Sequence, residues 1–98
     1  MDVRKVTELY FKQNDMTNMM EYGESSGALA FGDMSEIIAD CLEELGIKVD
    51  YHYAEYYSDG KYTVTVGYKD IEYSEVMKAW WGSEEVADYI ENFLERIK

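Results

Sequence analysis

The dipeptide Asp59-Gly60 constrains the fold of this 98-residue chain more than any other feature. It lies between two stretches in which apolar and polar residues alternate. Both central residues of a type I′ turn need positive φ, and Asp-Gly is among the pairs that favour this turn. We therefore expect a β-hairpin with Asp59-Gly60 at its tip.

The alternation also predicts the register of the hairpin. The first strand begins at Ile47, with Ile47, Val49, Tyr51 and Tyr53 on its apolar face and Lys48, Asp50, His52 and Ala54 on its polar face. The second strand is expected over Lys61–Tyr68, and a third over Ile71–Tyr73 after a turn at Lys69-Asp70. A two-residue loop aligns the apolar positions by pairing Tyr57 with Tyr62, Tyr53 with Val66 and Tyr51 with Tyr68.

Helical spacing appears on both sides of this hairpin. A first helix starts after Asp2 and fades near Asp15, and a second has Asp33 as N-cap and ends before Gly46. The connector between them contains a short predicted strand at 28–31. Ser74 could cap a short helix through Trp80, and Ser83 caps a last helix. Helices packed on one face of a small antiparallel sheet make this an α+β fold, in a single domain over residues 1–98.

The order helix, three strands, helix over residues 33–98 resembles the double-stranded RNA-binding domain. Domains of that family place lysines at the start of the last helix, where they hold phosphates. This chain has Ser83-Glu84-Glu85 there, which would repel a phosphate backbone. We therefore expect no direct binding to nucleic acid.

The charge of the chain is strongly one-sided. There is no Lys or Arg between Lys12 and Lys48, and this stretch carries eight Asp and Glu residues within a net charge of −12. Charge of this kind destabilises a compact domain by self-repulsion, so it suggests a role beyond solubility.

The acidic residues form two ridges opposite the apolar stripes of their helices, because they recur at three- and four-residue spacing. The first lies on the second helix and comprises Glu36, Asp40, Glu43 and Glu44; the other lies on the last helix and comprises Glu84, Asp88, Glu91 and Glu95. Neighbours on a ridge stand about 5 to 6 Å apart, of the same order as phosphates along a DNA strand. Tyr56, on the hairpin, and Trp81 are candidate aromatic anchors at the edge of the contact.

In its size, its charge and its ridge pattern, the chain is similar to the small acidic DNA-mimic inhibitors of phages and mobile elements. These include anti-CRISPR and anti-restriction proteins. The resemblance implies a partner that is a basic nucleic-acid-binding protein, such as a nuclease effector, whose channel is occluded by carboxylates. The alternative is a non-enzymatic interaction module or homodimeric accessory protein whose acidity serves only solubility.

No strong signature of catalysis or cofactor binding accompanies these features. Gly23–Gly27 matches G-x-S-x-G, but 98 residues cannot house the large sheet that a nucleophile elbow needs. His52 is the single histidine, and no catalytic partners can be named for it. Cys41 is the single cysteine, so an internal disulfide cannot form. The carboxylates do not follow the spacing of an EF-hand calcium site. We predict that the chain is no enzyme and binds no metal or cofactor. The sequence has no apolar run of the length of a signal peptide or a membrane span, so we expect the protein in the cytoplasm. If a phage encodes it, this would be the cytoplasm of the host cell.

Overall fold

The computed structural model describes residues 2–13, 27–78 and 82–97. The elements are α1 (Val3–Gln13), α3 (Gly27–Glu44), β1 (Tyr51–Ser58), β2 (Lys61–Tyr68), β3 (Ile71–Lys78) and α4 (Ser83–Arg96). The three strands form one antiparallel sheet in the order β1-β2-β3. The predicted α+β class is confirmed.

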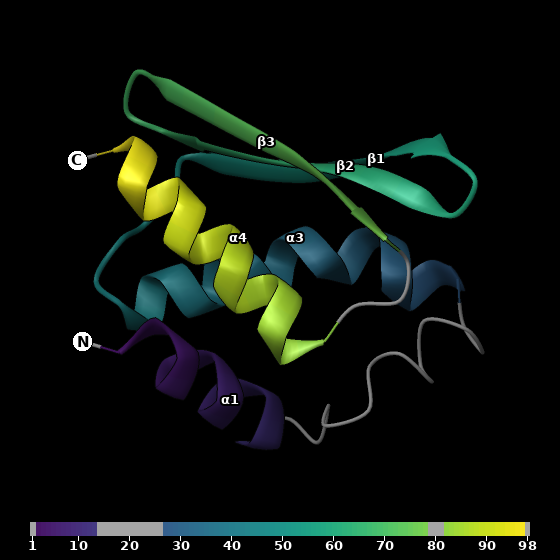
Figure 1. Cartoon of the computed structure of the whole chain (residues 1–98). Helices are drawn as coiled ribbons and strands as arrows, with labels where there is room; N and C mark the ends of the chain where they lie inside the picture. Colours follow the sequence, from purple (N-terminus) through teal and green to yellow (C-terminus); the bar gives the residue numbers. More distant parts are fainter. Residues whose placement is uncertain (1, 14–26, 79–81, 98) are drawn as a thin grey trace.

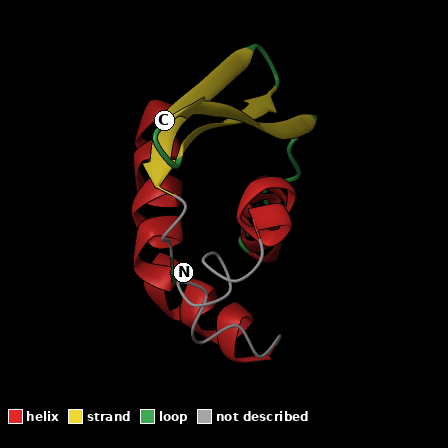
Figure 2. Cartoon of the chain, turned by 90° about the vertical axis from the view of Figure 1, so that its right-hand side faces the viewer, coloured by secondary structure: helices red, strands yellow, loops and turns green. Residues whose placement is uncertain are grey.

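The helices lie on one side of the sheet. α3 packs against β1 and β2, α4 packs against β3, and α1 packs beneath both helices on the side away from the sheet (Figures 1 and 2). None of the described helices covers the opposite face, which we call the open sheet face. The core fills the space between sheet and helices; its buried apolar residues are Phe11, Ile37, Ile38, Cys41, Leu42, Val64, Val66, Met77, Val86, Tyr89, Ile90 and Phe93.

The hairpin turn forms as the sequence predicts. Asp59 and Gly60 have φ values of 47° and 72°, as a type I′ turn requires. Lys69, in the second predicted turn, also has positive φ, at 56°. Asp2 caps α1, because its carboxylate accepts hydrogen bonds from the backbone N–H groups of Arg4 and Lys5.

The predicted register of β1 against β2 is wrong by one residue. Tyr53 pairs with Thr65 and Tyr51 with Gly67, because the register shifts between Tyr56 and Ser58. One extra residue in a strand turns every following side chain to the other face. Tyr51 and Tyr53 consequently lie on the open sheet face, whereas Ala54 packs against the core.

α3 begins seven residues earlier than predicted, at Gly27 rather than after an N-cap at Asp33. The expected strand at 28–31 is helical, and Asp33 lies inside the helix instead of capping it. One interior glycine, Gly32, costs a helix only about 1 kcal/mol, so a helix of 18 residues tolerates it. A four-residue strand would instead need a neighbouring strand for its backbone hydrogen bonds.

β3 is longer than predicted, and the short helix from Ser74 is not formed. Ser74 lies within β3, paired with Thr65. Glu75 interrupts the alternation of apolar residues along β3, where an apolar side chain would be expected. The strand accommodates it because its carboxylate accepts hydrogen bonds from the hydroxyl of Tyr73 and from Asn92 Nδ2. The last helix has Gly82 rather than Ser83 as its N-cap.

Candidate binding surface

The acidic ridge on α3 is exposed along most of its length. Glu36, Glu43 and Glu44 are exposed, and Asp40 is half-buried. The Tyr10 hydroxyl of α1 donates a hydrogen bond to Asp40 Oδ2 at 2.6 Å. Burial, together with this bond, raises the pKa of Tyr10 well above its ordinary value. Tyr10 therefore stays a neutral donor that orients the Asp40 carboxylate.

An open hollow of about 450 Å³ lies at the junction of α1 and α3, lined by Tyr10, Asp40, Glu43 and Glu44. A second hollow, of about 260 Å³, shares Tyr10 and Glu44 and adds Val6, Leu9 and Gln13. Leu9 is 53% exposed. The two hollows thus combine carboxylates with exposed apolar surface. This chemistry suits the aliphatic stem and charged head of a Lys or Arg side chain.

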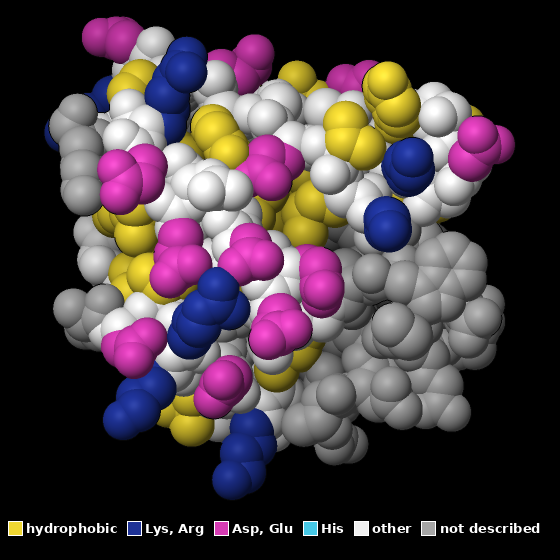
Figure 3. All heavy atoms as spheres, in the orientation of Figure 1, with side chains coloured by type: hydrophobic (Ala, Val, Ile, Leu, Met, Phe, Trp, Pro, Cys, Tyr) yellow, Lys and Arg dark blue, Asp and Glu magenta, His cyan; other side chains and the backbone are white. Residues whose placement is uncertain are grey.

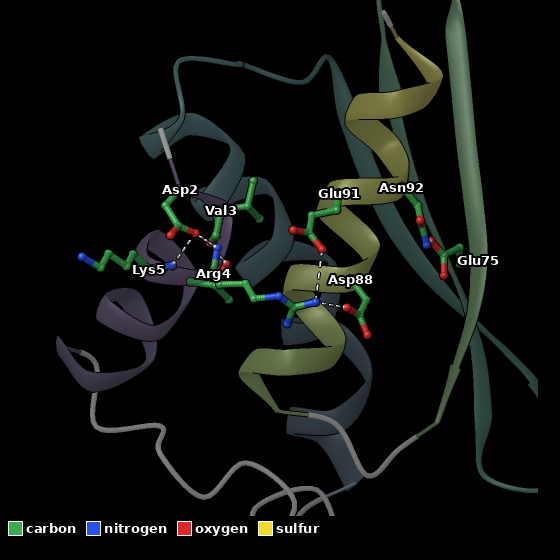
Figure 4. Close-up of polar contacts among 9 residues, drawn as sticks. Asp2, Val3, Arg4, Lys5, Glu75, Asp88, Glu91 and Asn92 are labelled. Carbon is green, nitrogen blue, oxygen red and sulfur yellow. Dashed lines mark hydrogen bonds and ion pairs between the residues drawn. The ribbon is translucent and has the colours of Figure 1, made fainter.

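The ridge on α4 is partly neutralised by α1. Arg4 Nη2 lies 2.5 Å from Asp88 Oδ1 and 3.2 Å from Glu91 Oε1 (Figure 4). The hydrogen bond to Asp88 and the charge of Glu91 raise the pKa of Arg4. The sequence predicts the two carboxylates as free ligands for a partner, whereas in the structure they share this guanidinium.

Other acidic residues surround this ion pair. Figure 3 shows Asp and Glu side chains gathered over α4 and around a basic side chain in their midst. Of these, Glu84 and Glu95 are exposed, as is Glu91 of the ion pair itself. Glu85 instead closes the start of α4, because its carboxylate accepts a hydrogen bond of 2.7 Å from the Gly82 backbone N–H.

The two predicted aromatic anchors have different outcomes. Tyr56 is 60% exposed, and its hydroxyl accepts a hydrogen bond of 3.0 Å from the Asp59 backbone N–H. Its ring meets Tyr62 edge-on, with centroids 5.8 Å apart. Tyr56 therefore supports the hairpin turn as well as offering an exposed ring. Trp81 lies outside the described residues.

Sequence reasoning missed the tyrosines of the open sheet face. Tyr51 and Tyr53 are 45% and 40% exposed, and their rings are stacked with centroids 6.3 Å apart. The signal that could have found them is Gly67: a strand glycine often marks a position that a neighbouring aromatic ring covers.

Among the residues considered for catalysis, the two that the structure describes, His52 and Cys41, are in separate surroundings. His52 Nδ1 lies 3.0 Å from the hydroxyl of buried Ser35, so His52 faces α3 rather than the predicted polar face. Cys41 is buried, and burial raises the pKa of its thiol to about 12, which keeps it protonated. Gly23–Ser26 lie outside the described residues. Across the described parts of the chain, no three His, Cys, Asp or Glu side chains are grouped closely enough to hold a metal ion.

Comparison with known proteins adds no relative. No family model matches the chain, and neither a curated protein nor a solved structure is significantly similar to it. Within the described residues, no helix has the length and apolar character needed to cross a membrane.

Proposed function

We propose that this chain is a non-enzymatic inhibitor that binds the basic, nucleic-acid-binding surface of a partner protein and excludes nucleic acid from it. The partner class that we favour is a nuclease effector of a CRISPR or restriction defence system. The contact would be made first by the ridge on α3, with α4 as a second face.

The uncompensated charge of α3 is the observation that carries this proposal. α3 contains five acidic residues and no Lys or Arg. Among the described residues, the ion pairs are those of Arg4 with α4, so the described α3 carboxylates have no cationic partner in that part of the chain. A ridge of such carboxylates attracts a basic surface at long range and can pair with its Arg and Lys side chains on contact.

The Arg4 ion pairs distinguish the two ridges. A partner's cations would have to compete with Arg4 for Asp88 and Glu91, whereas Glu36, Glu43 and Glu44 are exposed and need no such exchange. The hydrogen bond from Tyr10 holds Asp40 in place on the same ridge, and because the donor is neutral, the carboxylate keeps its full negative charge. The α3 ridge is therefore the better mimic of a phosphate backbone.

The test is inhibition of DNA cleavage by a panel of purified CRISPR and restriction nucleases. We expect the wild-type chain to inhibit at least one of them. The double variant Glu36→Lys, Glu43→Lys should lose inhibition by more than tenfold, since removing one partner of an interfacial charge pair costs about 2 to 5 kcal/mol.

The matched control is Glu8→Lys with Asp70→Lys, which makes the same change in net charge at two exposed positions off the ridges. It should inhibit as the wild type does, and circular dichroism should show both variants folded. Equal loss of inhibition in the control and the ridge variant would mean that only overall charge matters. Undiminished inhibition by the ridge variant would contradict the proposal.

A homodimeric accessory protein remains the second candidate function. The exposed, stacked pair of Tyr51 and Tyr53 favours this function, because exposed aromatic surface suits docking of a protein and has no role in binding by the acidic ridges.

A further inference from the structure

The open sheet face has a chemistry unlike that of the rest of the molecule. Strand pairing defines four rows across it, which are Tyr51-Gly67-Glu72, Tyr53-Thr65-Ser74, Glu55-Thr63-Val76 and, at the far end, Ser58-Lys61-Lys78. These rows contain two Glu and two Lys, so the face is formally neutral although the chain carries −12. Two such faces would therefore meet with little net charge repulsion between them.

The aromatic end of the face is held in a defined shape. A Cβ atom at Gly67 would lie 2.1 Å from the Tyr51 ring, so the ring lies directly across the glycine. The Tyr51 hydroxyl reaches over β2 and donates a hydrogen bond of 2.7 Å to Glu72 Oε1. The ring of Tyr53 stacks beside it at an interplanar angle of 14°. Little rotamer freedom remains to be lost when this surface is covered.

In the middle of the face, the side-chain hydroxyl groups of Thr65 and Ser74 are hydrogen-bonded to each other, so neither opposes burial. These two residues lie opposite one another, and their hydroxyl groups are hydrogen-bonded at 2.7 Å. Val76 adds apolar surface, being 49% exposed. The middle can therefore be covered without leaving those two polar groups unsatisfied.

The lysine end lacks a counter-charge in its own row. Lys61 and Lys78 are directly paired across β2 and β3, and like charges in such positions destabilise a sheet. Glu72 lies six residues along the strand from Lys78, a separation of about 20 Å. The face thus has a cationic end and an aromatic, anionic end.

We propose that the open sheet face is a homodimer interface, in which two copies pack sheet to sheet about a two-fold axis. The axis would lie between the sheets and run across the strands, at the level between Thr63 and Thr65. This rotation brings Lys78 of each copy over Glu72 of the other and Lys61 over the other's Tyr51 ring. The pairs formed are two ion pairs and two cation–π contacts.

A second copy fits this face better than a nucleic acid or a basic peptide. Nucleic acid would be repelled by the net charge of the chain, and a uniformly basic peptide would meet Lys61 and Lys78 at one end. Only a surface with both signs in reversed order matches the whole face, and the face itself is such a surface. The acidic helices would remain on the outside of the dimer.

The size of the face predicts a weak dimer. Three strands of eight residues span about 26 by 14 Å, or about 370 Å² of flat area, given the usual spacings of strands. Stable complexes bury about 800 Å² per partner. We therefore expect association in the micromolar to millimolar range rather than a permanent dimer.

The test is sedimentation equilibrium from about 10 μM to about 1 mM, the range suited to an interface this small. The wild type should show a monomer–dimer equilibrium. Lys78→Glu and Glu72→Lys should each weaken it by at least about tenfold, because each replaces two ion pairs with two like-charge contacts. Mixing the two variants should restore dimers, since each heterodimer then pairs opposite charges at both positions.

The control is Lys12→Glu, which makes the same change in charge on α1, on the opposite side of the molecule; it should leave the equilibrium unchanged. Circular dichroism would confirm that the variants remain folded. A wild type that stays monomeric to 1 mM would overturn the proposal. So would a mixture of the two variants that fails to associate, or a control that weakens association as much as Lys78→Glu. None of these results depends on whether the α3 ridge inhibits a nuclease.

Discussion

The substitution Tyr89→Phe tests how α4 is attached to the sheet. Tyr89 is 1% exposed, and its hydroxyl donates to the carbonyl of Val64 at 2.8 Å and, at a longer 3.2 Å, to that of Tyr73. Phenylalanine keeps the ring, including its edge-on contact with Tyr73 at 5.2 Å between centroids. The change therefore removes one donor hydrogen from two carbonyl acceptors, one of them fully buried, and little else.

The expected cost follows from that geometry. One hydroxyl hydrogen is shared by two carbonyls, so the loss amounts to about one hydrogen bond, or about 1 to 1.5 kcal/mol of the free energy of unfolding. For a domain of this size, that corresponds to a fall in Tm of about 4 to 12 °C. The control is Tyr57→Phe, because Tyr57 is 60% exposed and its change should stay within about 0.5 kcal/mol.

The assay is urea denaturation followed by circular dichroism, with thermal melts in parallel. Tyr89→Phe should lower the denaturation midpoint at an unchanged m value, while Tyr57→Phe should leave both unchanged. A Tyr89→Phe variant as stable as the wild type would refute the view that this hydroxyl joins α4 to β2 and β3.

Three further outcomes follow from the structure. Burial is the main reason that the pKa values of Tyr10, Tyr73 and Tyr89 are raised above 10, so their contribution to stability is complete below pH 10 and is lost as pH rises further. The urea midpoint should therefore fall above about pH 10, together with the rise in absorbance that marks tyrosine ionisation. Cys41, buried with a pKa of about 12, should react with a thiol reagent such as Ellman's reagent only at the rate of unfolding, and fast labelling of the native chain would contradict its burial. Gly67→Ala should displace the Tyr51 ring and weaken self-association in the sedimentation experiment while the fold is kept; unchanged association would mean that the ring position is irrelevant to docking.

Much of the fold could be predicted from local sequence because turn and helix signals act over a few residues. Asp59-Gly60 specifies its turn through backbone conformation alone. The stripe Val86, Ile90 and Phe93 marks the buried side of α4 through spacing alone.

The register of β1 could not be predicted in this way. Its sequence places tyrosines on both faces of the strand, so the two possible orientations differ little in apolar character. The shift between Tyr56 and Ser58 and the packing of Ala54 against the core decide the orientation, and both depend on contacts beyond the strand itself.

The candidate site was predicted in outline and not in detail. Spacing identified both acidic ridges, but it could not show that Arg4, 84 residues from Asp88 in sequence, lies against the ridge on α4. It also could not show that the Tyr10 hydroxyl binds Asp40. Which carboxylates remain uncompensated depends on where α1 docks, and that is set by the core around Phe11.

The dependence of partner binding on salt concentration shows whether the carboxylates of the α3 ridge make the contact. Once a nuclease is inhibited, its affinity for the wild type and for the variant Glu36→Lys, Glu43→Lys should be measured from about 50 to 300 mM salt, a range over which screening changes strongly. If the α3 ridge replaces a phosphate backbone, affinity for the wild type should fall steeply with salt, and the variant should bind more weakly with a shallower slope. An affinity that is independent of salt, and equal in wild type and variant, would mean that the α3 ridge does not bind the nuclease.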